Sequence, residues 1–115
     1  MTKLDQLRDA LRAFTAARDW NRFHSPKNLA MALSVEAAEL LEVFQWMTDA
    51  DSRNPEPAAK AAASEEVADV LLYLILLSDA LGIDPVAAAE RKIIANGQKY
   101  PVEKARGTSA KYTRL

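Results

Sequence analysis

Two short acidic motifs are the residues of this sequence best suited to chemistry. Glu36 and Glu39 form the first pair, and Glu66 and Asp69 form the second, each with its carboxylates three positions apart. In a helix, residues with this spacing lie on one face, with Cβ atoms roughly 5–6 Å apart. If the two helices pack antiparallel, the four carboxylates meet near the centre of the pair, in an arrangement suited to binding a cation.

Apolar residues follow both acidic pairs, so the carboxylates need a partner. No Lys or Arg occurs from Asn28 to Thr48, and unpaired charges in apolar surroundings are costly to desolvate. Oxygen ligands without Cys or His are typical of a hard cation such as Mg²⁺. Pairing of these acids with Lys or Arg across a helical bundle is the alternative. A di-iron centre is excluded, because it needs Glu-x-x-His motifs and the only histidine, His24, lies outside both pairs.

An aromatic residue occurs two helical turns after each acidic pair. Trp46 lies seven residues after Glu39, and Tyr73 lies seven residues after Glu66. Each helix should therefore present its carboxylates and an aromatic ring along one stripe. This combination suits a metal-bound polyphosphate with a flat group that stacks beside it.

A polar face near the end of the chain could contact the same ligand. Lys92, Asn96 and Lys99 are spaced to share one face of a helix, where two cations flanking an amide could hold phosphate oxygens and a ribose or base edge. An ordinary solvated face is the alternative.

The segment 20–28 mixes aromatic and polar side chains between two expected helices. Trp20, His24 and Asn28 are of the types that often line a ligand pocket, whereas Trp20 and Phe23 could equally fill a hydrophobic gap. No glycine-rich phosphate loop occurs in the sequence. Phosphates would therefore be bound through a metal and side chains.

The composition limits the class of protein. The 115 residues suit one domain, and a 50% hydrophobic content with only three Gly favours helices. A net charge of −1 gives no electrostatic footprint for a nucleic-acid polymer, and the lack of Cys excludes disulfides and thiol catalysis. The polar N-terminus is unlike a signal peptide, and the longest apolar stretch, 70–77, is too short to span a bilayer. We therefore expect a soluble, cytoplasmic protein without a membrane partner.

Helix start and stop signals predict four helices, with a polar connection over 49–57. No alternating strand pattern occurs, so the expected fold class is all-α, with a four-helix bundle-type subunit. We expect one domain over 1–100, followed by a basic tail over 101–115. The expected helices run from Thr2 to about Trp20, from Ser25-Pro26 to about Met47, from Asn54-Pro55 to Gly82, and from Asp84-Pro85 to Asn96 or Gly97.

The third expected helix indicates assembly with other copies of the chain. From Val70 to Leu77 only Tyr73 carries a polar side-chain atom, so the segment is apolar around its whole circumference. Such a helix is normally enclosed, and three other helices of a small domain could hardly enclose it. We therefore expect a helical homo-oligomer; a tightly wrapped monomeric bundle is the alternative.

These motifs together resemble those of the MazG-like, all-α nucleoside triphosphate pyrophosphohydrolases, in particular the dCTP pyrophosphatase branch. The acidic pairs alone are moderately specific, but together with Phe-Gln-Trp at 44–46 and Lys-Tyr-Pro at 99–101 they are highly specific. The resemblance covers nearly the whole chain, through segments 18–20, 23–24, 26–29, 36–39, 44–46, 65–71, 99–102, 105–107 and 111–113.

The resemblance implies a homo-oligomer, a tetramer or a dimer, that hydrolyses a nucleoside triphosphate to the monophosphate and pyrophosphate with Mg²⁺ as cofactor. The implied substrate is dCTP or a modified dCTP. The implied metal ligands are Glu36, Glu39, Glu66 and Asp69, with Glu36 and Glu39 as candidates for the base that positions the attacking water. The implied nucleotide contacts are Trp20, His24, Asn28, Trp46, Tyr73, Lys92 and Asn96.

One departure from the branch leaves the base preference open. Leu11 stands where the dCTP pyrophosphatases of animals carry a His on the first helix. A broad-specificity pyrophosphatase that removes non-canonical nucleotides is therefore the alternative enzyme. A non-catalytic helical oligomerisation module, whose acids form salt bridges between subunits, is the alternative from another class.

Overall fold

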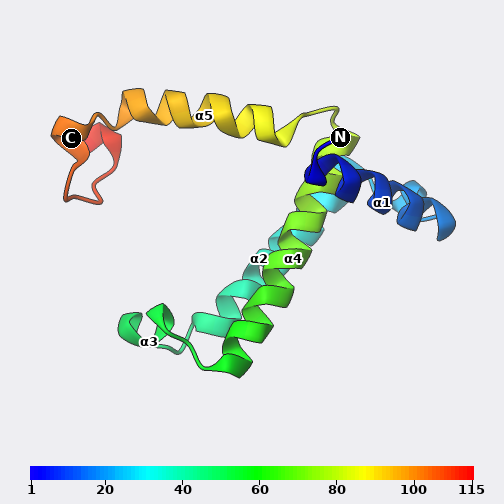
Figure 1. The fold of residues 1–115 in the computed structure, drawn as a ribbon, viewed down its shortest axis with the longest axis horizontal. Coiled ribbons are helices and arrows are strands. Elements are labelled where there is room, and N and C mark those ends of the chain that lie inside the picture. The colour runs from blue at the N-terminus through cyan, green and yellow to red at the C-terminus, as the bar shows by residue number, and fades with distance from the viewer. The chain divides into compact units, whose positions relative to one another are not determined.

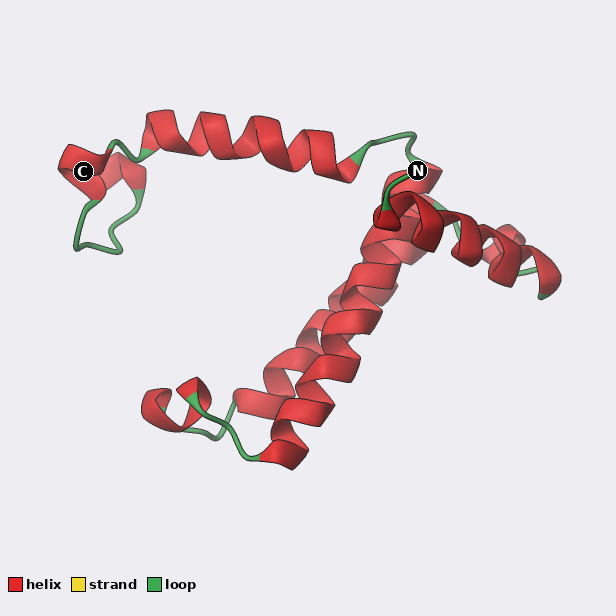
Figure 2. Ribbon diagram, viewed as in Figure 1, coloured by secondary structure: helices red, strands yellow, loops and turns green.

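The computed structural model describes residues 1–115 and contains helices and connecting segments but no strand (Figures 1 and 2). The predicted all-α fold class is confirmed. The structure has two short helices beyond the four that we expected, so the predicted helix count is wrong. The elements are α1 (Lys3–Ala17), η1 (Asn21–Phe23), α2 (Pro26–Phe44), α3 (Asp49–Arg53), α4 (Pro57–Ala80), α5 (Pro85–Lys99), α6 (Val102–Ala105) and η2 (Tyr112–Arg114), where η denotes a 3₁₀-helix.

The predicted helix N-termini of α1, α2 and α5 are confirmed by their caps. At α1, the Thr2 hydroxyl accepts from the Asp5 amide at 3.1 Å while the Asp5 carboxylate accepts from the Thr2 amide at 3.1 Å, a complete capping box. The Ser25 hydroxyl accepts from the Asn28 amide at 3.2 Å and so caps α2. Asp84 caps α5 in the same way. Side-chain acceptors thus satisfy backbone amides that have no partner within the helix.

Several predicted boundaries are wrong for local reasons. The third long helix begins at Pro57, not at Asn54-Pro55, because Glu56 precedes a proline and is extended, with ψ 151. Thr48 is extended as well and caps the unexpected helix α3 within the predicted connection.

The helix ends differ from the predictions too. α1 ends at Ala17, before Trp20, and α2 ends at Phe44, before Met47. α5 continues through Gly97 to Lys99, and part of the predicted tail forms α6 and η2.

The chain divides into two compact units, residues 1–82 and 83–115. In the first unit, α2 and α4 lie side by side and antiparallel, and the α3 segment joins their ends (Figure 1). α1 packs on α4. The core is small: Leu29 and Ile75 are its buried apolar residues, with exposed fractions of 2% and 3%.

The apolar circumference of α4 is not enclosed within a single chain. Val67, Leu71 and Leu74 are 54%, 39% and 40% exposed, although each would gain by burial. Val35 and Leu41 of α2 are exposed as well. The α2–α4 pair therefore presents apolar surface that this chain does not cover.

In the second unit, the C-terminal residues fold onto the end of α5. The Tyr100 and Tyr112 rings meet edge to face at 5.9 Å, and Lys99 Nζ lies 4.9 Å from the Tyr112 ring centroid. Ile93 and Ile94 of α5 are largely exposed. No single helix of the chain is both long enough and apolar enough to cross a membrane. Only α4 and α5 counted together, with the bend between them, have the length and apolar composition of a membrane span.

Candidate metal centre and adjoining pocket

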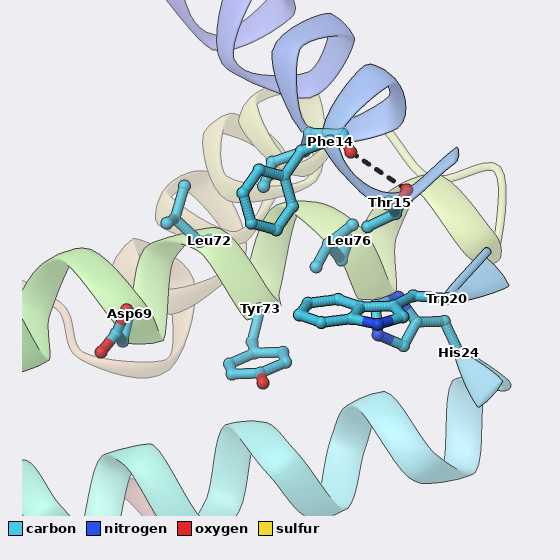
Figure 3. Close-up of a pocket in the computed structure, with 9 residues that line it drawn as sticks. Phe14, Thr15, Trp20, His24, Asp69, Leu72, Tyr73 and Leu76 are labelled. Carbon is cyan, nitrogen blue, oxygen red and sulfur yellow. Dashed lines mark hydrogen bonds between the residues drawn. The ribbon is translucent and has the colours of Figure 1, made fainter. Parts of the chain in front are cut away.

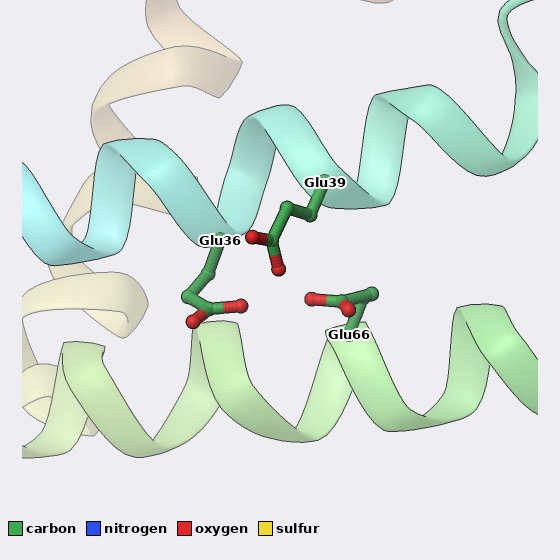
Figure 4. Close-up of side chains that lie close together, drawn as sticks. All are labelled: Glu36, Glu39 and Glu66. Atoms are coloured by element: carbon green, nitrogen blue, oxygen red, sulfur yellow. The ribbon is translucent and has the colours of Figure 1, made fainter.

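Three of the four predicted acidic residues converge between α2 and α4. Glu36 and Glu39 project from α2 toward Glu66 on α4 (Figure 4). One carboxylate oxygen from each of the three residues lies within 4.8 Å of the other two. The i to i+3 spacing places Glu36 and Glu39 on one face of α2 as predicted, and the antiparallel packing brings Glu66 opposite them.

The electrostatics of this cluster are unfavourable without a cation. All three side chains are half-buried, and Glu36 Oε2 and Glu66 Oε2 are buried with no hydrogen-bond partner. The pKa of Glu36 is raised chiefly by its contact with the Glu66 carboxyl group, with which it can share a proton, and secondarily by burial. The negative charge of Asp69 raises this pKa further. The contact with Glu36 and the charge of Glu36 raise the pKa of Glu39. No Lys or Arg forms an ion pair with any of these acids.

This donor set fits a metal ion. Three carboxylates from two helices, with two buried oxygens that lack partners, are the ligands that a hard divalent cation takes. The alternative in which these acids pair with Lys or Arg is not seen in this chain. Asp69 is not one of the three converging ligands, but its charge acts on Glu36 and its side chain borders a neighbouring pocket. The acidic cluster can therefore hold a metal ion beside that pocket.

The neighbouring pocket is an aromatic-lined cavity of ≈ 200 Å³ formed by α1, the segment after it, and α4 (Figure 3). Asp69 and Tyr73 project from the same side of α4, and the Trp20 indole lies beside His24 (Figure 3). The pocket joins polar groups at one side to an apolar interior, a common form of small-molecule site. Its lining residues are Leu11, Phe14, Thr15, Trp20, His24, Asp69, Leu72, Tyr73 and Leu76.

A sharp turn after α1 places Trp20 in this pocket. Asp19 adopts a left-handed backbone conformation, with φ 54, and the Trp20 amide donates to the Thr15 carbonyl at 3.0 Å. The Trp20 ring then meets Phe14 edge to face at 5.7 Å and His24 at 6.2 Å. Aromatic contacts of this geometry add to the gain from burial.

Three of the seven predicted nucleotide contacts line this pocket, and four do not. Trp20, His24 and Tyr73 line it together with Asp69, which we had predicted as a metal ligand. The Asn28 side-chain amide instead donates to the Phe23 carbonyl at 2.9 Å, which holds the turn before α2.

Trp46 does not share a stripe with Glu39. Because α2 ends at Phe44, the helical register that the prediction assumed does not reach Trp46, whose side chain is 90% exposed. Lys92 and Asn96 lie exposed on α5, in the second unit.

The apolar walls of the pocket were missed by the sequence analysis. Their signal was present, since α1 carries apolar residues at helical spacing, but such spacing usually marks a core. Phe14 is nevertheless 45% exposed. The missed lining residues are Leu11, Phe14, Thr15, Leu72 and Leu76.

The fold and the site define an all-α protein with a carboxylate cluster between two antiparallel helices. The model of the MazG-like family matches residues 31–115. The chain belongs to this family.

Relatives and a solved structure agree with this assignment. The chain is 42% identical over 114 residues to dCTP pyrophosphatase 1 of Rattus norvegicus, covering 97% of this chain and 67% of that protein. It is 41% identical over 114 residues to dCTP pyrophosphatase 1 of Homo sapiens, with the same coverage. A crystal structure of a pyrophosphatase from Archaeoglobus fulgidus superimposes with a TM-score of 0.79 at 42% identity, covering 88% of this chain and 94% of that one.

Proposed function

We propose that this chain is a magnesium-dependent nucleoside triphosphate pyrophosphohydrolase, which converts a deoxynucleoside triphosphate and water to the monophosphate and pyrophosphate. The observation that carries this proposal is the placement of three converging carboxylates, without a basic partner, next to an aromatic pocket. Relatives named dCTP pyrophosphatase and a structural neighbour named pyrophosphatase support it.

Glu36, Glu39 and Glu66 hold the metal in this proposal, with Asp69 as the fourth ligand. When bound, Mg²⁺ supplies positive charge that neutralises the phosphates and stabilises the pyrophosphate leaving group. Glu36 and Glu39 are the candidates for the general base, since both carboxylates belong to the cluster where the metal and the attacking water would lie. A residue that binds the metal directly is a poorer base, so only one of the two is expected to serve.

The aromatic pocket receives the nucleoside. Trp20 and Tyr73 offer ring faces for stacking, and His24 and Asp69 offer polar groups. We propose dCTP or a modified dCTP as substrate, because the relatives carry that name, and a role in removing unwanted nucleotides from the cytoplasmic pool.

A broader substrate range is the second candidate, and Leu11 favours it. Leu11 contributes an apolar wall to the pocket, and the Thr15 hydroxyl beside it donates to the Leu11 carbonyl at 3.0 Å. The α1 residues that line the pocket, Leu11, Phe14 and Thr15, therefore offer no free side-chain donor that would recognise one base edge. This second candidate would discriminate only weakly between bases.

A homo-oligomer, with a tetramer favoured over a dimer, completes the proposed enzyme. The exposed apolar surface of α2 and α4 is of the kind that a bundle of several helices buries. Trp46 is 90% exposed and lies outside this chain's pocket, and Lys92 and Asn96 are exposed on α5. We propose that these three residues reach the nucleotide bound to a neighbouring subunit.

A substrate panel tests the function. Pyrophosphate release would be measured for dCTP, 5-substituted dCTP, dUTP and the purine triphosphates, each with Mg²⁺ and with a chelator. We expect Mg²⁺-dependent release of pyrophosphate, highest with the cytidine nucleotides. Equal rates across the panel would establish the broad-specificity enzyme, and no release from any triphosphate would overturn the proposal.

A further inference from the structure

We infer that Arg12 and Asp79 are positioning residues, which set α1 against α4 and thereby hold the walls of the nucleoside pocket. Arg12 Nε donates to Asp79 Oδ2 at 2.8 Å, and Arg12 Nη2 donates to Asp79 Oδ1. Two parallel hydrogen bonds fix the orientation of the guanidinium as well as its distance from the carboxylate. The inference rests on the proposed function insofar as the pocket is taken to bind a nucleoside.

This pair is the one directional side-chain link between two α-helices. Every other side-chain hydrogen bond joins residues at most five positions apart, and no other ion pair reaches beyond one helical turn. The α1–α4 contact otherwise depends on apolar packing. Such packing is non-directional, so it holds two helices together without fixing how one slides or turns on the other.

The apolar contact of α1 is also limited. Thr15 is buried, with 3% exposure, but its hydroxyl donates within α1, and Phe14 remains 45% exposed. A rotation of α1 would therefore meet little resistance from the core. Arg12 and Asp79 supply that resistance from the edge of the interface, where Asp79 keeps 25% of its side-chain surface exposed.

The position of the pair links it to the pocket. Arg12 and Asp79 border a second cavity of ≈ 240 Å³, and Thr15, His24 and Leu76 line both this cavity and the nucleoside pocket. Those three side chains form the partition between the two spaces. A shift of α1 at Arg12 would thus move the partition and, through the turn that follows α1, the Trp20 ring.

Loss of Asp79 leaves Arg12 with another partner. Asp9 Oδ1 lies 3.6 Å from Arg12 Nη1 on α1 itself, so the guanidinium would remain paired while the link to α4 is lost. Replacement of Asp79 therefore removes the tie between helices without leaving an unpaired cation. This makes Asp79→Asn, an isosteric change, a suitable variant.

Steady-state kinetics test the positioning role. We expect Asp79→Asn and Arg12→Ala to raise KM for the preferred triphosphate by about tenfold while kcat changes less than twofold, because the metal cluster lies on other residues and small misplacements of binding groups weaken binding. The charge-exchanged double variant, Arg12→Asp with Asp79→Arg, should recover part of the lost affinity. Arg53→Ala, which removes the exposed Arg53–Asp49 pair, is the matched control and should leave KM unchanged.

An unchanged KM in both single variants would overturn the inference, as would a fall in kcat at constant KM. Should Arg12→Ala fail to fold, Arg12→Lys decides, since it keeps the charge but cannot form the two-pronged contact. We expect an intermediate KM for it, and the wild-type KM would count against the inference.

A measurement without substrate separates this inference from the proposed function. In a Trp46→Phe background, Trp20 is the only tryptophan, and its fluorescence reports the pocket wall. We expect Asp79→Asn in that background to increase acrylamide quenching of Trp20 in fully folded protein. Increased quenching, together with a wild-type protein that hydrolyses no triphosphate, would reject the function and keep the positioning role; unchanged quenching would reject the positioning role.

Discussion

Helix α4 carries carboxylates in two opposite environments. Glu66 faces Glu36 and Glu39, with a buried oxygen that has no hydrogen-bond partner and no basic residue in reach. Asp79, in the last turn of the helix, accepts hydrogen bonds from Arg12 Nε and Nη2. The first arrangement is costly in the absence of a ligand and the second is satisfied within the chain. The first environment is typical of a functional site, and the second is typical of a structural ion pair.

The largest expected effect comes from neutralising one acid of the cluster. Glu39→Gln and Asp69→Asn should each lower Mg²⁺-dependent turnover by at least about 100-fold, because a ligand or base is lost while the shape is kept. Pyrophosphate release measures the change, and circular dichroism checks the fold. Full activity in both variants would break the comparison, since these acids would then be no more functional than Asp79.

Metal should stabilise the protein through the cluster alone. A cation that binds only the folded state at 100 times its Kd contributes about 2.7 kcal/mol. We therefore expect millimolar Mg²⁺ to raise the melting temperature of the wild type, to do so much less in Glu36→Gln, and to do so fully in Asp79→Asn. An absent shift in the wild type, even with a non-hydrolysable nucleotide analogue, would favour the non-catalytic oligomerisation module.

The two environments should respond to pH with opposite signs. Because the folded-state pKa of Glu36 is raised from 4.5, the metal-free cluster destabilises the fold at neutral pH, and this cost fades as the pH falls through the raised value. Because the pKa of Asp79 is lowered from 3.8, chiefly by its hydrogen bonds to Arg12, its contribution is present above 3.8 and is lost as the pH falls through the lowered value.

Melting temperatures across pH, measured with a chelator, would test these signs. Glu36→Gln should melt above the wild type at neutral pH and approach it in acid. Asp79→Asn should melt below the wild type at neutral pH and approach it only at lower pH than Glu36→Gln does. The same sign of difference for both variants at neutral pH would contradict the assignment.

The smallest effect is expected at a third kind of carboxylate. Asp49 accepts from Arg53 at 3.2 Å in α3, with side chains that are 87% and 77% exposed. Exposed pairs of this kind contribute between zero and about 1 kcal/mol. Arg53→Ala should therefore leave urea unfolding and turnover nearly unchanged, and a large loss in either would show that α3 matters beyond its own turn.

The acidic cluster was accessible from the sequence because helical spacing is local. Helical spacing alone places Glu36 and Glu39 on one face, and the absence of Lys and Arg from Asn28 to Thr48 indicated that they have no basic partner on their own helix. Trp46 could not be placed by the same argument, since its position depends on where α2 ends. That end is set by the turn into α3 and by the extended, capping Thr48.

The link between Arg12 and Asp79 was beyond reach for a different reason. Its partners are 67 positions apart, so no local pattern pairs them, and Arg12 resembles Arg8, the other arginine of α1. The walls of the pocket share this property, because Phe14 and Leu76 come to line one pocket only when α1 packs on α4. Local patterns thus predicted the long helices and the convergence of Glu36, Glu39 and Glu66, and contacts distant in sequence determined the pocket.

The left-handed turn at Asp19 restricts which sequences can keep this pocket. The φ angle of Asp19 is 54°, a backbone conformation that Gly, Asn and Asp adopt readily and that is strained for β-branched residues. Among family members that retain a tryptophan after the first helix, the preceding residue should therefore be confined to those three types. Although Asp19 is exposed to solvent, substitutions at this position are thus restricted by the turn that places the Trp20 ring in the pocket.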